Sequence, residues 1–210
     1  MARTPGARDA TFDQRRRELA LAAARALLRP EGGAASFRSL VAATGASASV
    51  LQHYFGAHQG LIVAAFEAAR ELGAPSVRVM ADPGEAPLAA SMTAAASWLR
   101  EGWRAGVGTL QAAGLVHGLG NPTLGPAYVE HLLEPSVQAV EARLAVHRDR
   151  GELRPDADLR FAALAFVSPL ILALLHQSEL SGRTCRPLDV DAFVAAHVDS
   201  FVAGWGARSA

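Results

Sequence analysis

The side chains with the clearest chemical capacity in this 210-residue chain lie between Ser47 and His58. Gln52 carries an amide that both donates and accepts hydrogen bonds, and such an amide can pair with a base edge, most simply that of adenine. The hydroxyl and imidazole groups around it can hydrogen-bond phosphate oxygens or polar base atoms. The chemistry available in this segment is therefore recognition by hydrogen bonding.

Arginine is unevenly distributed along the sequence. The chain has 20 Arg, no Lys and 20 acidic residues, so its formal net charge is zero. Residues 1–70 carry nine Arg and five acids, whereas the remainder carries eleven Arg and fifteen acids. Arg3, Arg8 and the run 15–17 crowd the N-terminal end, a distribution suited to contact with a DNA backbone. On charge alone, a solvated helix face explains the pattern equally well.

Several kinds of site are excluded by residue types and motifs. The single cysteine, Cys185, rules out a disulfide framework and a multi-thiolate zinc site. The sequence contains no HExxH, GxxxxGK[ST] or GxSxG motif, and its isolated histidines and acids form no recognisable catalytic pair. Gly118-Leu-Gly120 lacks the third glycine and the preceding strand of a dinucleotide site. We therefore expect no catalytic site, no metal and no cofactor.

The longest apolar stretch, Leu159–Leu175, is shorter than the roughly 20 residues of a membrane span. Arg160, Ser168 and Pro169 also interrupt it, so it predicts a buried helix. The N-terminus lacks the long apolar run of a signal peptide. These features indicate a cytoplasmic protein, and the Arg, Ala, Gly and Pro usage is typical of a GC-rich bacterial genome.

Almost every segment has a helical pattern, because Ala and Leu abound and apolar residues recur at three- and four-residue spacing. The sequence therefore predicts an all-α fold of about nine helices. Thr11 and Gln14 have capping-box spacing at the start of the first helix, and Pro135 should kink or divide the seventh. The expected helices cover approximately residues 11–29, 36–45, 47–55, 57–72, 88–105, 109–119, 123–150, 159–180 and 189–205.

The composition changes between Gly73 and Pro87, where three prolines and two glycines interrupt the helical pattern. We therefore place a boundary in this stretch. Residues 1–56 are expected to form one domain with an Arg-rich arm, residues 57–72 a connecting helix, and residues 73–210 a second domain.

Residues 36–55 predict two short helices that meet across Gly45-Ala46-Ser47. Glycine tolerates the left-handed backbone of a sharp turn, and Ser47 can cap the amides of the next helix. The small residues Ala48 and Ser49 let the second helix approach a groove closely. The internal packing positions of a helix-turn-helix are filled by Leu40, Ala46, Leu51 and Tyr54.

With the Arg-rich arm before it, and with Tyr54-Phe55 and Leu61 after it, this motif resembles the N-terminal domain of the TetR (tetracycline repressor) family of transcriptional regulators. The resemblance covers approximately residues 12–70 by motif and the rest by helix order and length. In the C-terminal half of the chain, residues 151–156 and the apolar helix expected after them resemble the family's effector-binding and dimerisation domain. The chain departs from the family at Val41, at Gln52 and at His58, where the family commonly has a small residue, an aromatic and a basic residue.

The resemblance implies a sequence-specific DNA-binding regulator, a ligand-released repressor that acts as a homodimer on a palindromic operator in double-stranded DNA. Major-groove contacts are expected from Ser47, Ala48, Ser49, Gln52 and His53. Backbone contacts are expected from Ser36, Arg38, Tyr54, His58, Arg15 and Arg16. Core packing is the plain alternative for Tyr54, and simple surface exposure is the alternative for the two histidines.

The resemblance also implies a small hydrophobic or amphipathic effector within residues 80–180. Pocket positions are expected among polar or aromatic residues on otherwise apolar helices: Met92, Trp98, Trp103, His117, Tyr128, His131, Phe166, Ser168 and His176. For each of them an ordinary place in the core is the alternative.

Apolar stripes on the last two helices suggest a dimer interface, in which two helices from each subunit form a four-helix bundle with twofold symmetry. The stripe residues are Phe161, Ala165, Pro169, Ala173, Gln177, Val190, Val194, His197, Phe201 and Trp205. Burial of both stripes within one chain is the alternative.

A second class of function remains open at this point. The chain is also compatible with a non-enzymatic small-molecule-binding helical bundle whose DNA-binding head has degenerated, because His58 replaces the usual basic residue. Loss of all specific binding to its own upstream DNA would favour this alternative.

Overall fold

The computed structural model describes residues 5–28 and 37–207. Within these ranges the chain forms helices and no β-strand, which confirms the predicted all-α fold. The helices of the N-terminal part are α1 (Pro5–Leu27), α2 (Phe37–Thr44), α3 (Ala48–Phe55) and α4 (His58–Ala81). They are followed by α5 (Leu88–Gly102), the π-helical segment η1 (Trp103–Val107), α6 (Gly108–Gly118), α7 (Leu124–Tyr128), the π-helical segment η2 (Val129–Leu133), α8 (Glu134–Asp149), α9 (Leu159–Leu174), the π-helical segment η3 (Leu175–Glu179), α10 (Gly182–Cys185) and α11 (Val190–Trp205).

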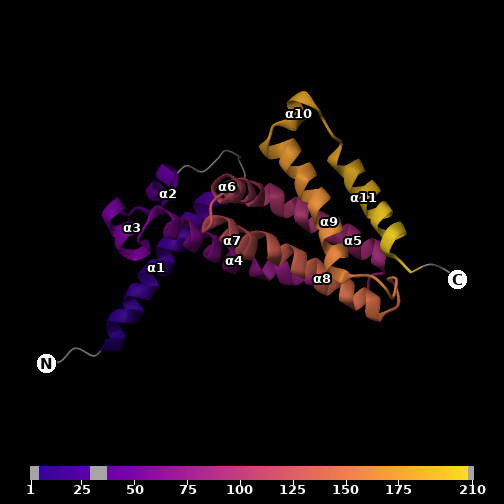
Figure 1. The fold of residues 1–210 in the computed structure, drawn as a ribbon, viewed down its shortest axis with the longest axis horizontal. Coiled ribbons are helices and arrows are strands. Elements are labelled where there is room, and N and C mark those ends of the chain that lie inside the picture. The colour runs from indigo at the N-terminus through magenta and orange to yellow at the C-terminus, as the bar shows by residue number, and fades with distance from the viewer. Residues whose placement is uncertain (1–4, 29–36, 208–210) are drawn as a thin grey trace.

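The helices form an elongated arrangement in which α1, α2 and α3 lie at one end and α9, α10 and α11 at the other (Figure 1). Helix α4 leaves the N-terminal end and runs beside α8 into the C-terminal half. Helix α1 packs on α4, and α11 packs on α5 and α9. Helix α4 is therefore the direct connection between the two ends of the molecule.

The predicted turn between α2 and α3 is confirmed in detail. Gly45 has a φ of 63°, a left-handed conformation that a side chain would disfavour. The Ser47 Oγ accepts a hydrogen bond from the Val50 amide at 3.4 Å and caps α3. Thr44 stabilises the same turn through a hydrogen bond that was not predicted: its Oγ1 donates to the Val41 carbonyl at 2.7 Å.

Two predicted helix ends are wrong. Helix α1 begins at Pro5, so Thr11 lies inside it and is no cap; proline is well suited to a first helical position, and the residues after it continue the helix. Helix α4 continues past Leu72 to Ala81, through Gly73 and Pro75. Pro75 is exposed, so water can replace the hydrogen bond that its ring removes from the helix. The expected loop after residue 181 also contains the short helix α10.

Buried apolar side chains gather in two clusters. The N-terminal cluster joins α1–α4 to α6, α7 and η2, with Phe66 and Tyr128 among its large members. The C-terminal cluster joins Met80, at the end of α4, to α5, α8, α9 and α11. Packing therefore groups α6 and α7 with the N-terminal helices, although they follow α5 in the chain.

By length and composition alone, Leu159–Glu179 is able to cross a membrane, with a mean hydropathy of 1.9 over its most apolar window. In the structure, one side of this segment buries Phe166, Val167 and Leu170 in the C-terminal cluster. Its apolar composition is therefore accounted for in part by the role of α9 as a core helix.

A buried cation closes the C-terminal end of α4. Arg143 of α8 is 3% exposed, and its Nε donates to the Met80 carbonyl at 2.6 Å. Its Nη2 donates to the carbonyls of Val79 (3.2 Å) and Asp82 (2.7 Å), and its Nη1 donates to the carbonyl (3.1 Å) and Oγ (2.6 Å) of Ser91 in α5. A positive charge at this point also suits the partial negative charge of a helix C-terminus. Arg143 thus fastens α4 to α5 and α8.

A chain of polar groups continues from Arg143 through the core. The Ser91 hydroxyl accepts from Arg143, so its own proton is available to His147 Nε2 at 2.8 Å. His147 Nδ1 lies 3.3 Å from Glu152 Oε2, which accepts a hydrogen bond from the Leu88 amide at 2.6 Å. Burial lowers the pKa of His147, and the nearby carboxylate of Glu152 opposes that shift. The arrangement fits a neutral His147 that ties α8 to the start of α5.

Replacing Arg143 with methionine should lower the free energy of unfolding by about 3 kcal/mol, because buried acceptors are left without a donor. Chemical denaturation of the two proteins measures this difference. The matched control is Arg160→Met, which removes an exposed arginine paired with Glu134 at 2.8 Å and should change stability little. Equal effects of the two substitutions would contradict the role given to Arg143.

Stability should fall as the pH is lowered below about 6.5, the ordinary pKa of histidine. Since the pKa of His147 is lowered in the folded protein, the unfolded chain binds the proton more readily in this window. One such site contributes at most about 1.4 kcal/mol per pH unit. Denaturation at pH 7.5 and 5.5 should show a smaller loss for His147→Gln than for the wild type. An identical loss in both would contradict this assignment.

Candidate DNA-binding head, effector core and dimer face

The short helices α2 and α3 are held by a small apolar interior. Leu40 and Leu51 are 0% and 4% exposed, and both belong to the N-terminal cluster with Leu61 of α4. The half-buried Ala46 and Tyr54 pack against the same cluster. The four residues predicted to pack inside a helix-turn-helix therefore do so.

One side of α3 is left open to solvent. Ser47, Ala48, Ser49, Gln52 and His53 are all exposed, and these five residues are the ones for which major-groove contacts were predicted. The hydroxyls of Ser47 and Ser49 lie 3.0 Å apart at the N-terminal end of the helix. Arg38 of α2 is exposed as well, whereas Ser36 lies outside the described residues. The structure thus presents a compact polar face on a capped helix.

Aromatic packing from α1 supports the C-terminal half of α3. The Phe12 ring stacks on the Tyr54 ring at a centroid distance of 4.7 Å and meets the His53 ring edge-on at 5.7 Å. The Tyr54 ring therefore packs against α1, in agreement with the alternative of core packing given for this residue. Phe12 was missed by the sequence analysis, and its only signal is an aromatic residue near the start of an Arg-rich helix.

Three neighbouring arginines of α1 have partners within the chain. The Arg16 guanidinium lies over the Phe55 ring, 5.5 Å from its centroid, and Arg15 pairs with Glu18 at 2.9 Å. Arg17, which the sequence analysis did not select, pairs with Glu71 of α4 at 2.8 Å. The contacts of Arg16 and Arg17 tie α1 to α3 and α4, whereas the Arg15 pair lies within α1; all three lie at the surface or are partly exposed.

A hollow of about 260 Å³ separates α3 from the start of α4. Three of the predicted DNA-contacting residues, Ala48, Gln52 and His58, line it together. The His58 ring meets the His117 ring of α6 at a centroid distance of 6.3 Å. Burial and, to a smaller extent, the charge of His117 lower the pKa of His58. His58 therefore links the α3 side of the molecule to α6.

The residues predicted to bind an effector do not form one group. Met92 and Phe166 are completely buried in the C-terminal cluster, whereas Trp98 and Ser168 are exposed. His117 lies beside His58, and His176 hydrogen-bonds the neighbouring Gln177 side chain at 2.7 Å. The described hollow near the C-terminus, of about 600 Å³, is lined by residues of 148–156 and Ala207, none of which was predicted.

Three of the predicted effector residues place polar atoms inside the helical core. The Tyr128 hydroxyl donates to Gln111 Oε1 at 2.6 Å, and burial raises the pKa of Tyr128 to about 12. Within the described part of the chain, the buried atoms Trp103 Nε1 and His131 Nδ1 have no hydrogen-bond partner. Trp103 lies at the start of η1, which is kinked at Gly106 (φ 109°), and His131 lies in the π-helical segment η2, a kind of segment that is frequent at functional sites.

The expected dimer stripe on α11 faces its own chain. Val194 and Phe201 are 8% and 4% exposed in the C-terminal cluster, and the His197 ring stacks on Phe166 of α9. Ala173 and Gln177 are buried too, whereas Phe161 and Ala165 are exposed. Val194 and Phe201 thus pack within the chain, and the apolar period of α11 marks the side that lies on α5 and α9. Val190, Trp205 and Pro169 are partly buried.

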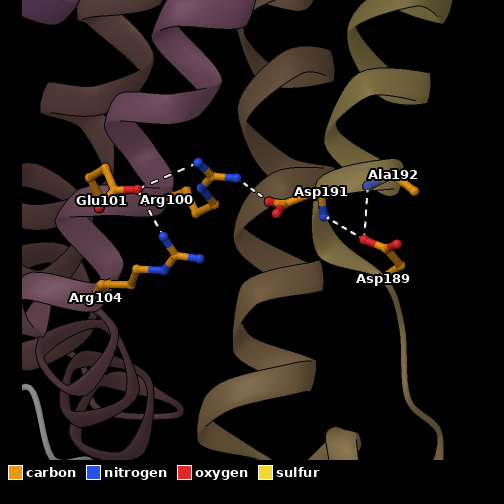
Figure 2. A network of polar contacts seen from close by, with 6 residues as sticks. All are labelled: Arg100, Glu101, Arg104, Asp189, Asp191 and Ala192. Atoms are coloured by element: carbon orange, nitrogen blue, oxygen red, sulfur yellow. Dashed lines mark hydrogen bonds and ion pairs between the residues drawn. The ribbon is translucent and has the colours of Figure 1, made fainter.

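A polar network fastens α11 to α5 (Figure 2). Arg100 of α5 donates to the Asp191 carboxylate, and Glu101 accepts from Arg104 at 3.0 Å. Asp189 Oδ1 accepts from the amides of Asp191 and Ala192, both at 3.0 Å, and caps α11. Of these contacts the Arg100–Asp191 pair joins α11 to α5, whereas the Arg104–Glu101 contact lies on the α5 side and the Asp189 cap lies within α11.

The outer side of α9 carries exposed apolar side chains instead. Phe161 and Leu172 are 66% and 64% exposed, and Leu164 is 37% exposed. Their spacing of three and eight residues places them along one side of the helix together with the exposed Ala165 and Ser168. This α9 stripe is the outward apolar surface of the last helices.

The structure brings together three residues in a catalytic-type arrangement that the sequence did not reveal. Ser91, His147 and Glu152 have the order and approximate distances of a Ser–His–Glu triad. However, Ser91 and His147 are 1% and 0% exposed, and Arg143 holds the serine oxygen. The group supports the core in this structure and offers a substrate no access. Among the described residues, no cluster of three His, Cys, Asp or Glu side chains is placed to hold a metal.

Comparisons with solved structures identify the fold. A protein from Mesorhizobium loti assigned to the TetR family of transcriptional regulators has a TM-score of 0.66 with this chain at 16% identity, over 93% of this chain and 98% of its own. Salmonella enterica GusR has a TM-score of 0.62 at 18% identity, over 90% and 96% of the two chains. FadR from Bacillus subtilis in complex with stearoyl-CoA has a TM-score of 0.60 at 14% identity, over 89% and 97%.

At the level of sequence, no family model and no curated protein matches the chain. The likeness is therefore one of three-dimensional structure, and it extends over both the N-terminal helices and the C-terminal half. The protein has the all-α fold of TetR-family transcriptional regulators.

Proposed function

We propose that the protein is a sequence-specific, DNA-binding transcriptional regulator that acts in the bacterial cytoplasm. The observation that carries this proposal is the exposed polar face of α3, on which Gln52 lies within a capped and internally packed helix-turn-helix. Such a helix enters the major groove with its N-terminal residues toward the base edges. Arg38 precedes α3 in the sequence and His58 follows it, and both side chains are suited to contact the phosphate backbone.

We further propose that two copies form the active unit, with the α9 stripe as a central part of the interface. An exposed apolar surface of this kind favours burial against an identical surface related by a twofold axis. A dimer with two recognition helices about one turn of DNA apart requires a palindromic operator. The protein would then act as a repressor whose affinity for the operator falls when a ligand changes this spacing.

The proposed ligand is a small hydrophobic or amphipathic molecule bound among α6, η1 and η2. The buried Trp103 Nε1 and His131 Nδ1 lack partners in the described chain and would gain them from polar atoms of such a ligand. The Bacillus subtilis FadR structure contains stearoyl-CoA, an amphipathic molecule, which supports this class by analogy of fold. The ligand would release the operator only if it favours one spacing of the heads over another.

The alternative is a ligand-binding bundle whose DNA-binding head is no longer used. The observation in its favour is His58, whose pKa is lowered by burial and by His117, so its positive charge is weakened at the start of α4.

The deciding experiment is an anisotropy titration of the purified protein against its own upstream intergenic DNA, with a scrambled duplex as competitor. Specific binding of a palindromic fragment supports the regulator. The alternative is supported if the upstream DNA binds no better than the scrambled duplex and a genome-wide selection of bound fragments also finds no specific site.

Replacing Gln52 with alanine should relax base preference more than it weakens binding overall. A bidentate amide–adenine contact contributes about 1–3 kcal/mol of discrimination, whereas the backbone contacts remain. Titrations against the operator and single-base variants, at several salt concentrations, measure this effect. The control, Arg38→Ala, should weaken all sequences alike and reduce the salt dependence. The same uniform loss for Gln52→Ala would show that Gln52 only positions the helix.

Replacing Phe161 with aspartate should convert the dimer to monomers, because a charge placed within the apolar α9 stripe would have no partner in the interface. Sedimentation velocity measures the mass. The matched control is Leu119→Asp, which places the same charge at another exposed apolar residue (77% exposed), outside α9, and should leave the dimer intact. A monomeric wild type, or a dimeric Phe161→Asp variant, would reject the proposed interface.

A further inference from the structure

The segment that follows α8 is fastened to the end of α11, at the end of the molecule away from α1–α3 (Figure 1). Gly151 ends α8 with a φ of 75°, a left-handed conformation that turns the chain back. The Arg154 amide then donates to the Trp205 carbonyl at 3.0 Å. The Ala207 amide donates in return to the Glu152 carbonyl at 2.8 Å. Backbone hydrogen bonds therefore fix the position of the side chains on this segment.

The hollow of about 600 Å³ near the C-terminus lies at this junction. Its volume falls within the range of small-molecule sites in proteins. In the described part of the chain, its wall carries two positive charges, one negative charge and an apolar surface. These are supplied by Arg148 and Arg154, by Asp156, and by Leu153, Pro155 and Ala207, respectively. The hollow thus combines a net positive charge with apolar contact area.

The two guanidinium groups at the hollow retain free hydrogen-bonding capacity. The Arg154 Nε is buried and has no hydrogen-bond partner among the described residues, and its ion pair with Asp156 is 3.7 Å long. The Arg148 Nε lies 4.0 Å from Asp149 Oδ1. Both distances exceed that of a hydrogen bond. The side chains of Asp149 and Asp156 are 76% and 81% exposed, so water competes with these weak pairs.

A neighbouring arginine shows what a fully engaged guanidinium looks like in the same region. The Arg150 Nη2 donates to the Gly84 carbonyl at 2.6 Å. Arg154 is instead held by a ring, because its guanidinium lies over Trp205 at 5.2 Å from the ring centroid. This contact orders the side chain and leaves its hydrogen atoms available to a ligand. A guanidinium that is already ordered loses less entropy when it binds an anion.

We propose that this hollow binds a small organic anion, whose phosphate or carboxylate group is held by Arg148 and Arg154. Guanidinium groups recognise both kinds of group through charge-assisted, often paired hydrogen bonds. Pro155 and Ala207 contact the apolar body of the molecule. The anion replaces the long ion pair with Asp156, which is exposed and contributes little. The site is separate from the effector site proposed among α6, η1 and η2, so it does not depend on the proposed function.

The test is isothermal titration calorimetry of the full chain with phenyl phosphate and with benzoate. Low ionic strength and a buffer free of phosphate and carboxylate limit screening and competition. We expect saturable binding of at least one of the two anions. Arg148→Gln and Arg154→Gln should each weaken it about tenfold, as expected for the loss of a charge-assisted hydrogen bond. Comparing the two probes shows whether the site prefers a phosphate or a carboxylate.

The matched control is Arg183→Gln, which removes the same charge from an exposed arginine of α10, at the other end of α11. It should leave the affinity unchanged, since general attraction by net charge is reduced equally in all three variants. Arg148 is itself exposed, so Arg148→Gln decides the matter even if Arg154→Gln disturbs folding. The proposal is overturned if neither anion binds saturably, or if Arg148→Gln and Arg183→Gln have equal effects. Neither result bears on DNA binding.

Discussion

The position of α3, the candidate DNA-binding helix, depends on the hydrogen bonds that solvate the buried guanidinium of Arg143. Arg143 has no carboxylate in direct contact in the described structure; it is held by backbone carbonyls at the end of α4 and by Ser91. A buried cation is costly unless its hydrogen bonds are made, and the helix terminus supplies both the acceptors and a favourable partial charge. The same contacts that solvate Arg143 therefore orient α4, and through α4 the N-terminal helices.

Local signals were sufficient to predict the helix-turn-helix from the sequence. Gly45 and Ser47 act through their own backbone conformation and their nearest amides, so distant residues do not alter their meaning. Pro75 shows where such reasoning fails, since whether a proline ends a helix depends on its exposure and on the packing of both flanking turns. The apolar period of α11 likewise identified a buried side, but periodicity does not distinguish the chain's own core from that of a partner.

The parts of the site that were missed depend on contacts between residues distant in the chain. Phe12 supports α3 from α1, and Arg17 reaches Glu71, which lies on a different helix. The effector positions were expected among polar or aromatic residues on otherwise apolar helices, and the residues expected on this ground include the buried Met92 and Phe166 and the exposed Trp98. The unpartnered atoms of Trp103 and His131 become visible only when the neighbours of each atom are known.

Ser91, His147 and Glu152 have a consequence for assigning enzymes from structure. Judged by interatomic distance alone, the 2.8 Å Ser–His contact would pass for a catalytic pair. Template matching records proximity but not accessibility or the donor already bound to the nucleophile. Here the serine oxygen accepts from an arginine and the side chain is 1% exposed. Hydrogen-bond networks that stabilise helical cores are thus a source of false positives, which a filter on the solvent exposure of the nucleophile removes.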